Sequence, residues 1–273
     1  MKKLYLPIII SILCLAVIGI FTGCEEKVSG KPTNFKIEAV SDTLVKLTWE
    51  APTEGTPDKY VVYFKAVGAA NYTAVTELAN TVFSYTHDPA GSTGDYYVAA
   101  KVGTTEYDSD VKSTIPKATS ALTVAELNAS GNSGYGWDAT TGVGATYSMT
   151  TTANVTKVDF YLTNFAVGTA TPYYIASPDQ GPSDLGGVVP AGAWRVNGIS
   201  NPITDPQAPL PKYISGTTYF NYTQLASYPT YLAVRTADGY YGLIKVDGLN
   251  TTDNTVQVEA WFQLVKGLRL IKH

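Results

Sequence analysis

The sequence predicts an all-β protein. From about residue 31 the chain consists of short runs of alternating apolar and polar residues, separated by Gly, Pro, Asn and Asp. No long stretch shows the helical period. Tyrosine is abundant, with 20 residues, and only 15% of the residues are charged, a composition that suits pleated, half-buried surfaces. We therefore expect antiparallel sheets arranged in consecutive domains.

The N-terminal segment does not belong to this β pattern. Two lysines precede an almost uninterrupted apolar run from Leu4 to Phe21, which is too short for a comfortable membrane span and is typical of a signal peptide. The run ends in Phe21-Thr22-Gly23-Cys24, which resembles the lipobox of bacterial lipoproteins. The resemblance implies removal of residues 1–23, diacylglycerol on the Cys24 thiol, and a tether over residues 24–30. An ordinary secretory signal followed by an accidental cysteine is the alternative.

The resemblance also implies where the protein resides. Several acyl chains, each gaining roughly 0.8 kcal/mol per buried methylene, hold a lipoprotein firmly, so we expect a lipid-anchored protein of the cell envelope, at the outer membrane or cell surface. The other cysteine, Cys14, falls inside the signal, so the mature chain forms no internal disulfide. Loss of the two signal lysines changes the net charge from −4 to −6. A weakly acidic surface disfavours nucleic acid as a partner.

A proline-led polar break divides the β chain into two predicted domains. Residues 115–121 read Ile-Pro-Lys-Ala-Thr-Ser-Ala, and the part before them has the length of one sandwich domain. We expect a first domain over residues 31–116, a linker over 117–121, and a second antiparallel β domain over 122–273.

Two strands of the first domain show clear alternation. The first places on one face the residues Val45, Leu47 and Trp49. The second places on one face the residues Tyr96, Val98, Ala100 and Val102. We expect Trp49 and Tyr96 to pack in the core, where each ring buries a large apolar area. His87 has no evident partner in the sequence and is expected to be a solvated loop histidine.

The same segment resembles a fibronectin type III domain. The matching features are Pro32 at the start, Trp49 in the second strand, a tyrosine-rich third strand over 60–64, the Tyr-x-Val-x-Ala pattern from Tyr96, and Thr114-Ile115-Pro116 at the close. The resemblance implies an immunoglobulin-like sandwich with Tyr96 in the place of the family's corner tyrosine. It also implies a spacer or a protein-binding module, because the fold itself carries no chemistry.

Three strands are predicted at the end of the second domain, roughly over residues 230–236, 240–247 and 255–265. Ala237-Asp238-Gly239 joins the first two, since glycine accepts the positive φ of a tight hairpin. Trp261 faces away from the side of the last strand that carries Val256, Val258, Ala260, Phe262 and Leu264. Trp261 is therefore either half exposed or covered by a neighbouring loop.

The run from Tyr231 to Val246 resembles the closing hairpin of the HmuY-like haem-scavenging surface lipoproteins. That family implies haem held by a pair of axial side chains, usually histidines. This sequence departs from the pattern, because His87 belongs to the other domain, His273 is terminal, and Met149 is the only methionine after the signal. We predict no cofactor and keep haem binding as an alternative function.

Residues 177–212 contain seven prolines and many glycines, which disfavours a long regular strand. Long irregular loops are usually functional or mobile. Trp194 and its neighbour Arg195 are candidates for a platform that binds a sugar ring or a partner's side chain. The alternative is that Trp194 forms a small core beneath its own loop. Further ligand-binding candidates are the aromatic residues Tyr135, Trp137 and Trp261.

The second domain lacks the groups of common catalytic and metal sites. A serine or cysteine nucleophile needs a base, and His273 is the only histidine there. Zinc needs several His or Cys ligands, and no loop has the spaced Asp pattern of a strong calcium site. Glycosidase chemistry needs only two carboxylates, and the domain offers Glu126, Asp138, Asp159, Asp179, Asp184, Asp205, Asp238, Asp247, Asp253 and Glu259. We predict no catalytic residue and no metal site, with a carboxylate-based glycosidase as the enzyme alternative.

Together these features predict a membrane-anchored, non-catalytic binding or adhesion protein. The type III sandwich is expected to act as a spacer that presents the second domain, whose loops recognise a polysaccharide or a protein.

Overall fold

A computed structural model describes residues 29–165 and 172–273. The predicted signal peptide over 1–23, Cys24 and most of the predicted tether lie outside the described residues. The regular secondary structure of the described residues is almost entirely β, which confirms the predicted fold class. No helix within these two ranges is long and apolar enough to cross a lipid bilayer.

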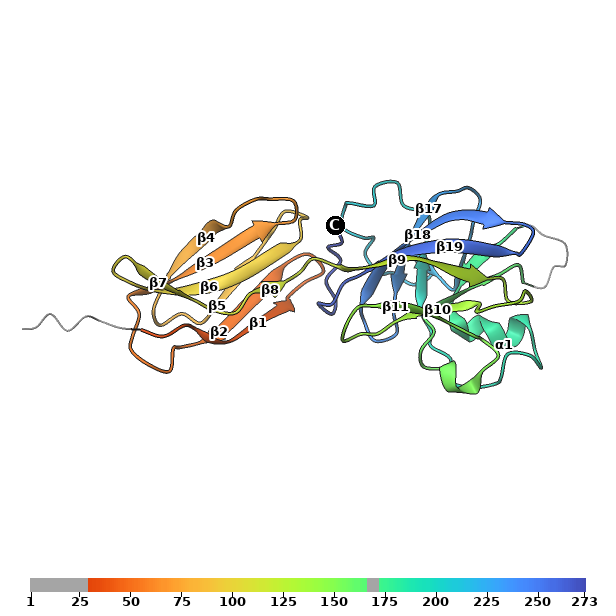
Figure 1. Cartoon of the computed structure of the whole chain (residues 1–273), viewed down its shortest axis with the longest axis horizontal. Coiled ribbons are helices and arrows are strands. Elements are labelled where there is room, and N and C mark those ends of the chain that lie inside the picture. Colours follow the sequence, from red (N-terminus) through yellow and green to blue (C-terminus); the bar gives the residue numbers. More distant parts are fainter. Residues whose placement is uncertain (1–28, 166–171) are drawn as a thin grey trace, which may run out of the picture.

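Two β lobes lie side by side along the longest axis of the molecule, and the C-terminus lies between them (Figure 1). We call them the sandwich lobe, over residues 29–116, and the second lobe, over residues 117–263. Residues 264–273 are called the C-terminal segment.

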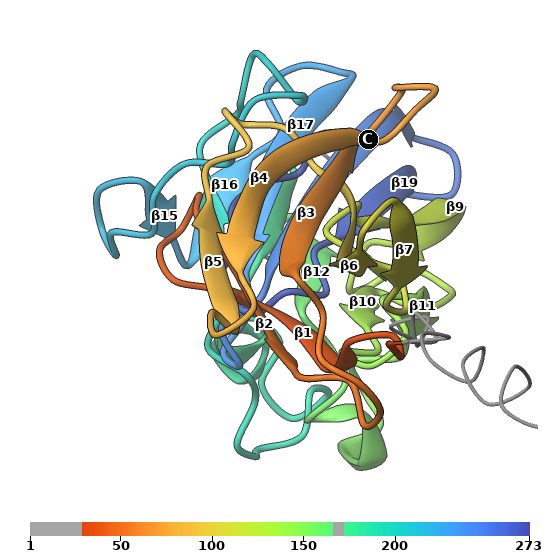
Figure 2. The ribbon, with the colours of Figure 1, turned by 90° about the vertical axis from the view of Figure 1, so that its left-hand side faces the viewer.

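The sandwich lobe consists of two antiparallel sheets (Figure 2). The three-stranded sheet has the order β1 (Thr33–Ala39), β2 (Val45–Glu50) and β5 (Ser84–His87). The other sheet has the order β4 (Thr73–Ala79), β3 (Lys59–Ala66), β6 (Gly94–Val102) and β7 (Thr105–Asp108), with β8 (Lys112–Ser113) also paired to β6. This arrangement confirms the predicted sandwich.

The predicted inward faces of these strands are confirmed. The buried residues include Val45, Leu47, Trp49, Tyr96, Val98 and Ala100. Trp49 meets Tyr60 edge-on, with the ring centroids 5.6 Å apart. Val102, at the end of β6, is only half-buried. The alternation in the sequence therefore identified the core face of both strands.

The prediction for His87 is wrong. His87 ends β5 instead of lying in a solvated loop, and its Nδ1 is 2.9 Å from the Tyr96 Oη. The half-buried imidazole also contacts the Phe64 ring edge-on, with centroids 5.1 Å apart. Burial lowers the pKa of His87, which favours the neutral ring. The partner was not evident from the sequence because Tyr96 belongs to the facing sheet.

The sandwich core also contains residues from the far end of the chain. Leu268 and Leu270 are both fully buried in the cluster that fills the sandwich. Between them, Arg269 Nε forms an ion pair of 2.9 Å with Asp42, which lies in the turn between β1 and β2. The C-terminal segment therefore completes the sandwich lobe and fastens it to the second lobe.

The second lobe is also built from two antiparallel sheets. The five-stranded sheet has the order β11 (Gly144–Tyr147), β10 (Gly134–Trp137), β12 (Phe160–Thr163), β13 (Tyr174–Ala176) and β16 (Tyr222–Gln224). The six-stranded sheet has the order β15 (Tyr219–Phe220), β14 (Gly198–Ser200), β17 (Thr230–Arg235), β18 (Tyr241–Asn250), β19 (Thr255–Phe262) and β9 (Lys117–Ala125). Three short helical elements are η1 (Thr152–Asn154), η2 (Pro178–Gln180) and α1 (Gly181–Asp184).

The main core of the second lobe lies between these sheets and includes Phe160 and Phe262. The residues predicted as a linker, 117–121, instead form the first half of β9, which pairs with β19 starting from Lys117. β9 is the edge strand of its sheet, and five of its nine residues are exposed, including the polar residues Lys117, Ser120 and Thr123. That composition made the strand look like a linker.

The three strands predicted at the end of the lobe are confirmed as β17, β18 and β19, with small differences at their ends. The predicted hairpin turn is also present, and Gly239 has a φ of 96°. The inward residues of β19 are buried as predicted, namely Val256, Val258, Ala260 and Phe262. Leu264 lies beyond the strand and is 38% exposed.

Residues 177–212, predicted to be an irregular recognition segment, instead cover the outer faces of both sheets. Val189 and Trp194 pack in a cluster on the outer face of the five-stranded sheet. Leu210, with Ile203 beside it, packs on the outer face of the six-stranded sheet. Apolar side chains in an irregular segment can bury a sheet face as well as a regular strand can. Much of this segment is therefore part of the folded core.

Candidate binding site

Two of the predicted ligand-binding residues, Tyr135 and Trp137, lie in the main core of the second lobe. Tyr135 is 0% exposed, and Trp137 is 7% exposed and stacks on Phe262 with ring centroids 5.3 Å apart. Trp137 also lies against Gly242, where a Cβ atom would come within 2.8 Å of the indole. Neither ring is therefore available to a ligand at the surface, because β10 turns both between the sheets.

Trp194 and Trp261 are also engaged within the protein. Trp194 is 5% exposed, and its Nε1 donates a hydrogen bond of 2.9 Å to the Pro190 carbonyl. It forms the small core beneath its own loop that the sequence left as the alternative. Trp261 is half-buried and stacks on His273, with ring centroids 4.0 Å apart. These rings therefore do not form the predicted platform.

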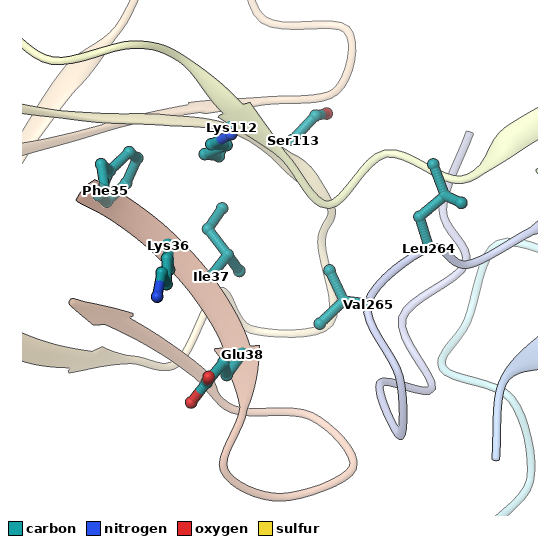
Figure 3. Close-up of a pocket in the computed structure, with 8 residues that line it drawn as sticks. All are labelled: Phe35, Lys36, Ile37, Glu38, Lys112, Ser113, Leu264 and Val265. Carbon is teal, nitrogen blue, oxygen red and sulfur yellow. The ribbon is translucent and has the colours of Figure 1, made fainter. Parts of the chain in front are cut away.

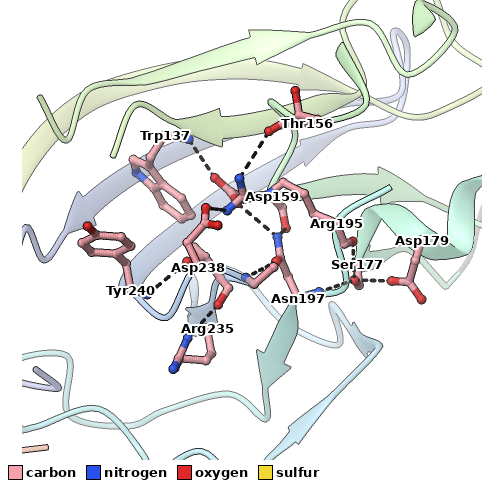
Figure 4. Close-up of polar contacts among 12 residues, drawn as sticks. Trp137, Thr156, Asp159, Ser177, Asp179, Arg195, Asn197, Arg235, Asp238 and Tyr240 are labelled. Atoms are coloured by element: carbon pink, nitrogen blue, oxygen red, sulfur yellow. Dashed lines mark hydrogen bonds and ion pairs between the residues drawn. The ribbon is translucent and has the colours of Figure 1, made fainter. Parts of the chain in front are cut away.

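Arg195, the fifth candidate, is the centre of a polar network (Figure 4). Its Nε forms an ion pair of 3.0 Å with Asp159, and its Nη2 one of 2.5 Å with Asp238. Its Nη1 donates to the Thr156 carbonyl at 3.2 Å. The Arg195 guanidinium thus connects its own loop to the segment 156–159 and to the turn that contains Asp238.

Asp159 is the buried member of this network, with 2% of its surface exposed. It accepts hydrogen bonds from the Trp137 backbone N–H at 2.9 Å and from Asn197 Nδ2 at 3.1 Å. Burial raises the pKa of Asp159 to about 6, against the opposing effects of Arg195 and these hydrogen bonds. Asn197 in turn accepts from the Ala237 N–H at 2.6 Å. The network fastens the loop before β14 to the turn between β17 and β18, which is a structural use of the charges.

The remaining carboxylates of the second lobe are engaged in the same manner. Groups of the chain itself donate to each of the ten carboxylates that the sequence offers in this lobe, either as hydrogen bonds or as ion pairs. Asp138, for example, accepts from the backbone N–H groups of Thr140 and Thr141, each at 2.8 Å. Most of these contacts shape turns and loops.

The side chains considered as haem ligands are placed apart. His87 is bonded to Tyr96 within the sandwich lobe, and His273 stacks on Trp261. Met149 is fully buried beneath residues 177–197. Within the described ranges, no group of three or more His, Cys, Asp or Glu side chains is arranged to hold a metal ion.

An aromatic cluster that the sequence analysis did not identify lies at the outer face of the five-stranded sheet. Phe165 meets Tyr174 and Tyr222 with centroid distances of 5.0 Å each, and the two tyrosines are 5.7 Å apart. Tyr222 is 49% exposed, and the other two rings are half-buried. We call these three residues the Tyr222 cluster. Its exposed tyrosine is braced by neighbouring rings and still presents half of its surface to solvent.

Strand register brings the members of the cluster together. Ala176 pairs with Tyr222, and Tyr174 pairs with Gln224, so the two tyrosines lie on the same face of the sheet, two residues apart. Phe165 follows β12 with a φ of 54°, in the left-handed region that bulky residues rarely adopt. Strain of this kind, about 1 to 3 kcal/mol, is found most often at functional sites.

A hollow of about 340 Å³ opens beside the cluster. Its walls are Ser215, Gly216, Phe220, Asn221 and Tyr222, all of them uncharged. Asn221 connects β15 to β16, the terminal strands of the two sheets, so the hollow lies where the sheets meet. Small uncharged polar groups beside exposed aromatic rings are typical of ligand-binding surfaces.

A second hollow, of about 350 Å³, lies between the sandwich lobe and the C-terminal segment (Figure 3). Ile37 and Val265 provide apolar walls, and Lys112 approaches from β8. Lys36 and Glu38 line the same hollow from the other side of β1. This mixture of aliphatic groups and opposite charges belongs to the joint between the lobes, and the Tyr222 cluster has the more distinct binding chemistry.

No protein-family model matches the chain, and no curated protein sequence matches it. Comparison with solved structures finds domain-sized β-sandwiches. The FN5 domain of Drosophila Lar is 15% identical with a TM-score of 0.26, over 32% of this chain and 96% of that one. The fn3 domain of human contactin 1 is 16% identical with a TM-score of 0.25, over 36% of this chain and 86% of that one.

A computationally redesigned β-sandwich protein is also similar, with 18% identity and a TM-score of 0.27, over 32% of this chain and 90% of that one. These likenesses concern the fold alone. The sandwich lobe combines a three-stranded antiparallel sheet with a second antiparallel sheet, as expected for the β-sandwich that the sequence predicts.

Proposed function

We propose that this chain is a lipid-anchored, non-catalytic binding protein of the cell envelope, and that it recognises a polysaccharide or a protein through the Tyr222 cluster. The anchor is inferred from the lipobox-like sequence that ends in Cys24. The sandwich lobe has the type of fold that commonly serves as a spacer or a binding module.

The observation that carries the proposal is the exposure of Tyr222. A half-exposed tyrosine, braced by Phe165 and Tyr174, offers a large contact area whose conformational freedom is already restricted, so little further entropy is lost on binding. Tyrosine is enriched at interfaces because its ring is apolar while its hydroxyl remains hydrogen-bonded. The uncharged hollow beside it adds polar groups for orientation.

A cell-adhesion experiment tests both parts of the proposal. Cells that express the intact protein are applied to surfaces coated with envelope or plant polysaccharides, or with extracellular proteins, and the bound cells are counted. The wild type is expected to adhere to at least one coating. A Cys24→Ser variant is expected to lose the lipid mass and to leave the membrane fraction, because the hydroxyl does not accept the lipid.

A Tyr222→Ala variant is expected to stay on the cell but to lose adhesion. The matched control is Tyr213→Ala, which removes a tyrosine that is 43% exposed but does not line the hollow. Equal adhesion by the Tyr222→Ala cells would remove the cluster from the proposal. An unchanged mass and membrane fraction for Cys24→Ser would remove the anchor.

A further inference from the structure

We infer that the Tyr222 cluster and its hollow bind an uncharged glycan, with a sugar ring packed against Tyr222 and its hydroxyls bonded to Asn221 and Ser215. This inference rests on the proposed function and selects one ligand class from the two that the function leaves open.

The charge of the site is the first argument. All five residues that line the hollow are uncharged. A site for an acidic or a basic polymer would need opposite charges at the contact, because a buried unpaired ligand charge carries a large desolvation cost. A neutral ligand carries no such cost. The lining therefore matches a polymer of neutral sugars better than a charged one.

The polar groups of the hollow are the second argument. Within the described residues, the exposed side chains of Asn221 and Ser215 make no hydrogen bond to another group of the chain. The side chains of Thr218 and Thr223, in contrast, each donate to a backbone carbonyl. A carboxamide and a hydroxyl each donate and accept, as sugar hydroxyls do. These two side chains thus supply uncommitted, uncharged groups within the hollow.

The arrangement of the rings is the third argument. Phe165 and Tyr174 meet Tyr222 at interplanar angles of 68° and 88°, so both brace it with T-shaped contacts and neither lies parallel to its ring. Tyr222 is left 49% exposed. An aromatic face packs well against the apolar C–H side of a pyranose ring. The cluster thus holds one tyrosine in place for such a contact.

The size of the site is the fourth argument. A hollow of about 340 Å³ is at the small end of the range for small-molecule sites, which is roughly 300 to 1,000 Å³. A stable protein partner buries about 1,200 to 2,000 Å² in total and needs a larger anchoring surface than one half-exposed ring. One or two sugar units of a longer chain fit the observed dimensions.

The experiment titrates the intact protein, solubilised in mild detergent, with neutral and charged oligosaccharides. The neutral probes are oligomers of glucose, mannose and xylose, and the charged probes are oligogalacturonate and chitosan oligomers. Binding is followed by calorimetry. At least one neutral series is expected to bind, with affinity rising from the first to the second sugar unit. The charged oligomers are expected to bind at least tenfold more weakly.

Three variants and one control variant locate the site. Asn221→Ala is expected to weaken binding several-fold with an unchanged melting temperature, because its exposed side chain has no partner to lose. Tyr222→Ala is expected to weaken binding about tenfold or more, and Tyr222→Phe to retain most of it because the ring remains. Tyr213→Ala, outside the hollow, is expected to bind like the wild type.

The outcomes separate the inference from the function on which it rests. Binding of charged oligomers alone, or neutral binding that Asn221→Ala and Tyr222→Ala leave unchanged, would overturn the inference. Adhesion to a protein coating that depends on Tyr222, without any glycan binding, would overturn the inference of a glycan ligand and leave the proposed function standing. Glycan binding that is weakened by both Asn221→Ala and Tyr222→Ala would support the inference and the proposed function together.

Discussion

At the residue scale, the hydrogen bond between His87 and Tyr96 shows how polar side chains are used inside this protein. The bond of 2.9 Å joins β5 of one sheet to β6 of the other. Burial raises the pKa of Tyr96 far above its ordinary value and lowers the pKa of His87. Both side chains are therefore held in their neutral forms, and the pair links the sheets without burying a charge.

The stability of the sandwich lobe is expected to fall as the pH is lowered from 7.5 to 5.5. Because the pKa of His87 lies below 6.5 in the folded state, the unfolded chain takes up its proton first, and stability present above pH 6.5 is lost on acidification. Urea denaturation at the two pH values measures the loss. The loss is expected to be smaller in His87→Gln, and an identical loss in that variant would contradict the assignment.

The wild type has to be compared with His87→Gln because Asp159 also titrates in the acidic range. Burial raises its pKa to about 6, so the folded state takes up this proton before the unfolded state does, and acidification from pH 6 towards pH 4 adds stability. The two groups thus act in opposite directions over neighbouring ranges. The difference between wild type and His87→Gln isolates the histidine, since both proteins contain Asp159.

The alternation around Tyr222 predicts that this residue is exposed, but it does not predict which rings lie beside it. Tyr222 and Gln224 are exposed and alternate with the buried Thr223 and Leu225, so period two was sufficient to place the tyrosine on a surface. Its neighbours Phe165 and Tyr174 reach it through the pairing of β13 with β16, which is a non-local register. The candidate site could not be assembled without that register.

At the scale of elements, the regular strands could be predicted, whereas the irregular segment that covers the outer faces of the sheets could not. β19 alternates between buried and more exposed residues, and β17 and β18 are largely apolar runs joined by a glycine turn, all of which are local signals. Residues 177–212 have no period, so nothing in their sequence distinguishes a loop that recognises a ligand from one that buries a sheet. The structure shows that their apolar side chains pack on the outer sheet faces.

Replacement of Trp194 is therefore expected to affect stability and not ligand binding. The ring is 5% exposed and packs among Met149, Tyr161 and Val189, so Trp194→Ala should lower the free energy of unfolding by about 3 to 5 kcal/mol. Denaturant titration of the intact protein measures it. The control is Val196→Ala, which is 65% exposed and should change the free energy by less than about 0.5 kcal/mol. A stable Trp194→Ala protein with weakened glycan binding would restore the loop as the recognition element.

At the scale of the whole molecule, the two lobes are joined at two points of the chain. Pro116 leads directly into β9 without a flexible linker. The C-terminal segment then returns to the sandwich lobe, and the fully buried Gln263 donates to the carbonyls of Thr114 and Leu270 at 2.8 and 2.7 Å. A joint of this kind restricts the hinge motion that is otherwise expected between domains. The sequence did not predict it, because residues 264–273 carry no signal of their distant contacts.

Removal of the last seven residues, 267–273, is expected to destabilise the sandwich lobe and to let the two lobes move relative to each other. Leu268 and Leu270 are fully buried in the sandwich core, and the loss of a buried leucine typically costs about 2 to 5 kcal/mol. Hydrogen exchange of the β6 amides should therefore accelerate, and small-angle scattering should show a broader distribution of interlobe distances. In the full-length chain, Leu270→Ala should accelerate exchange in the same strand, whereas Lys272→Ala, an exposed side chain, should not. Unchanged β6 exchange in Leu270→Ala would show that the sandwich is complete without the C-terminal segment.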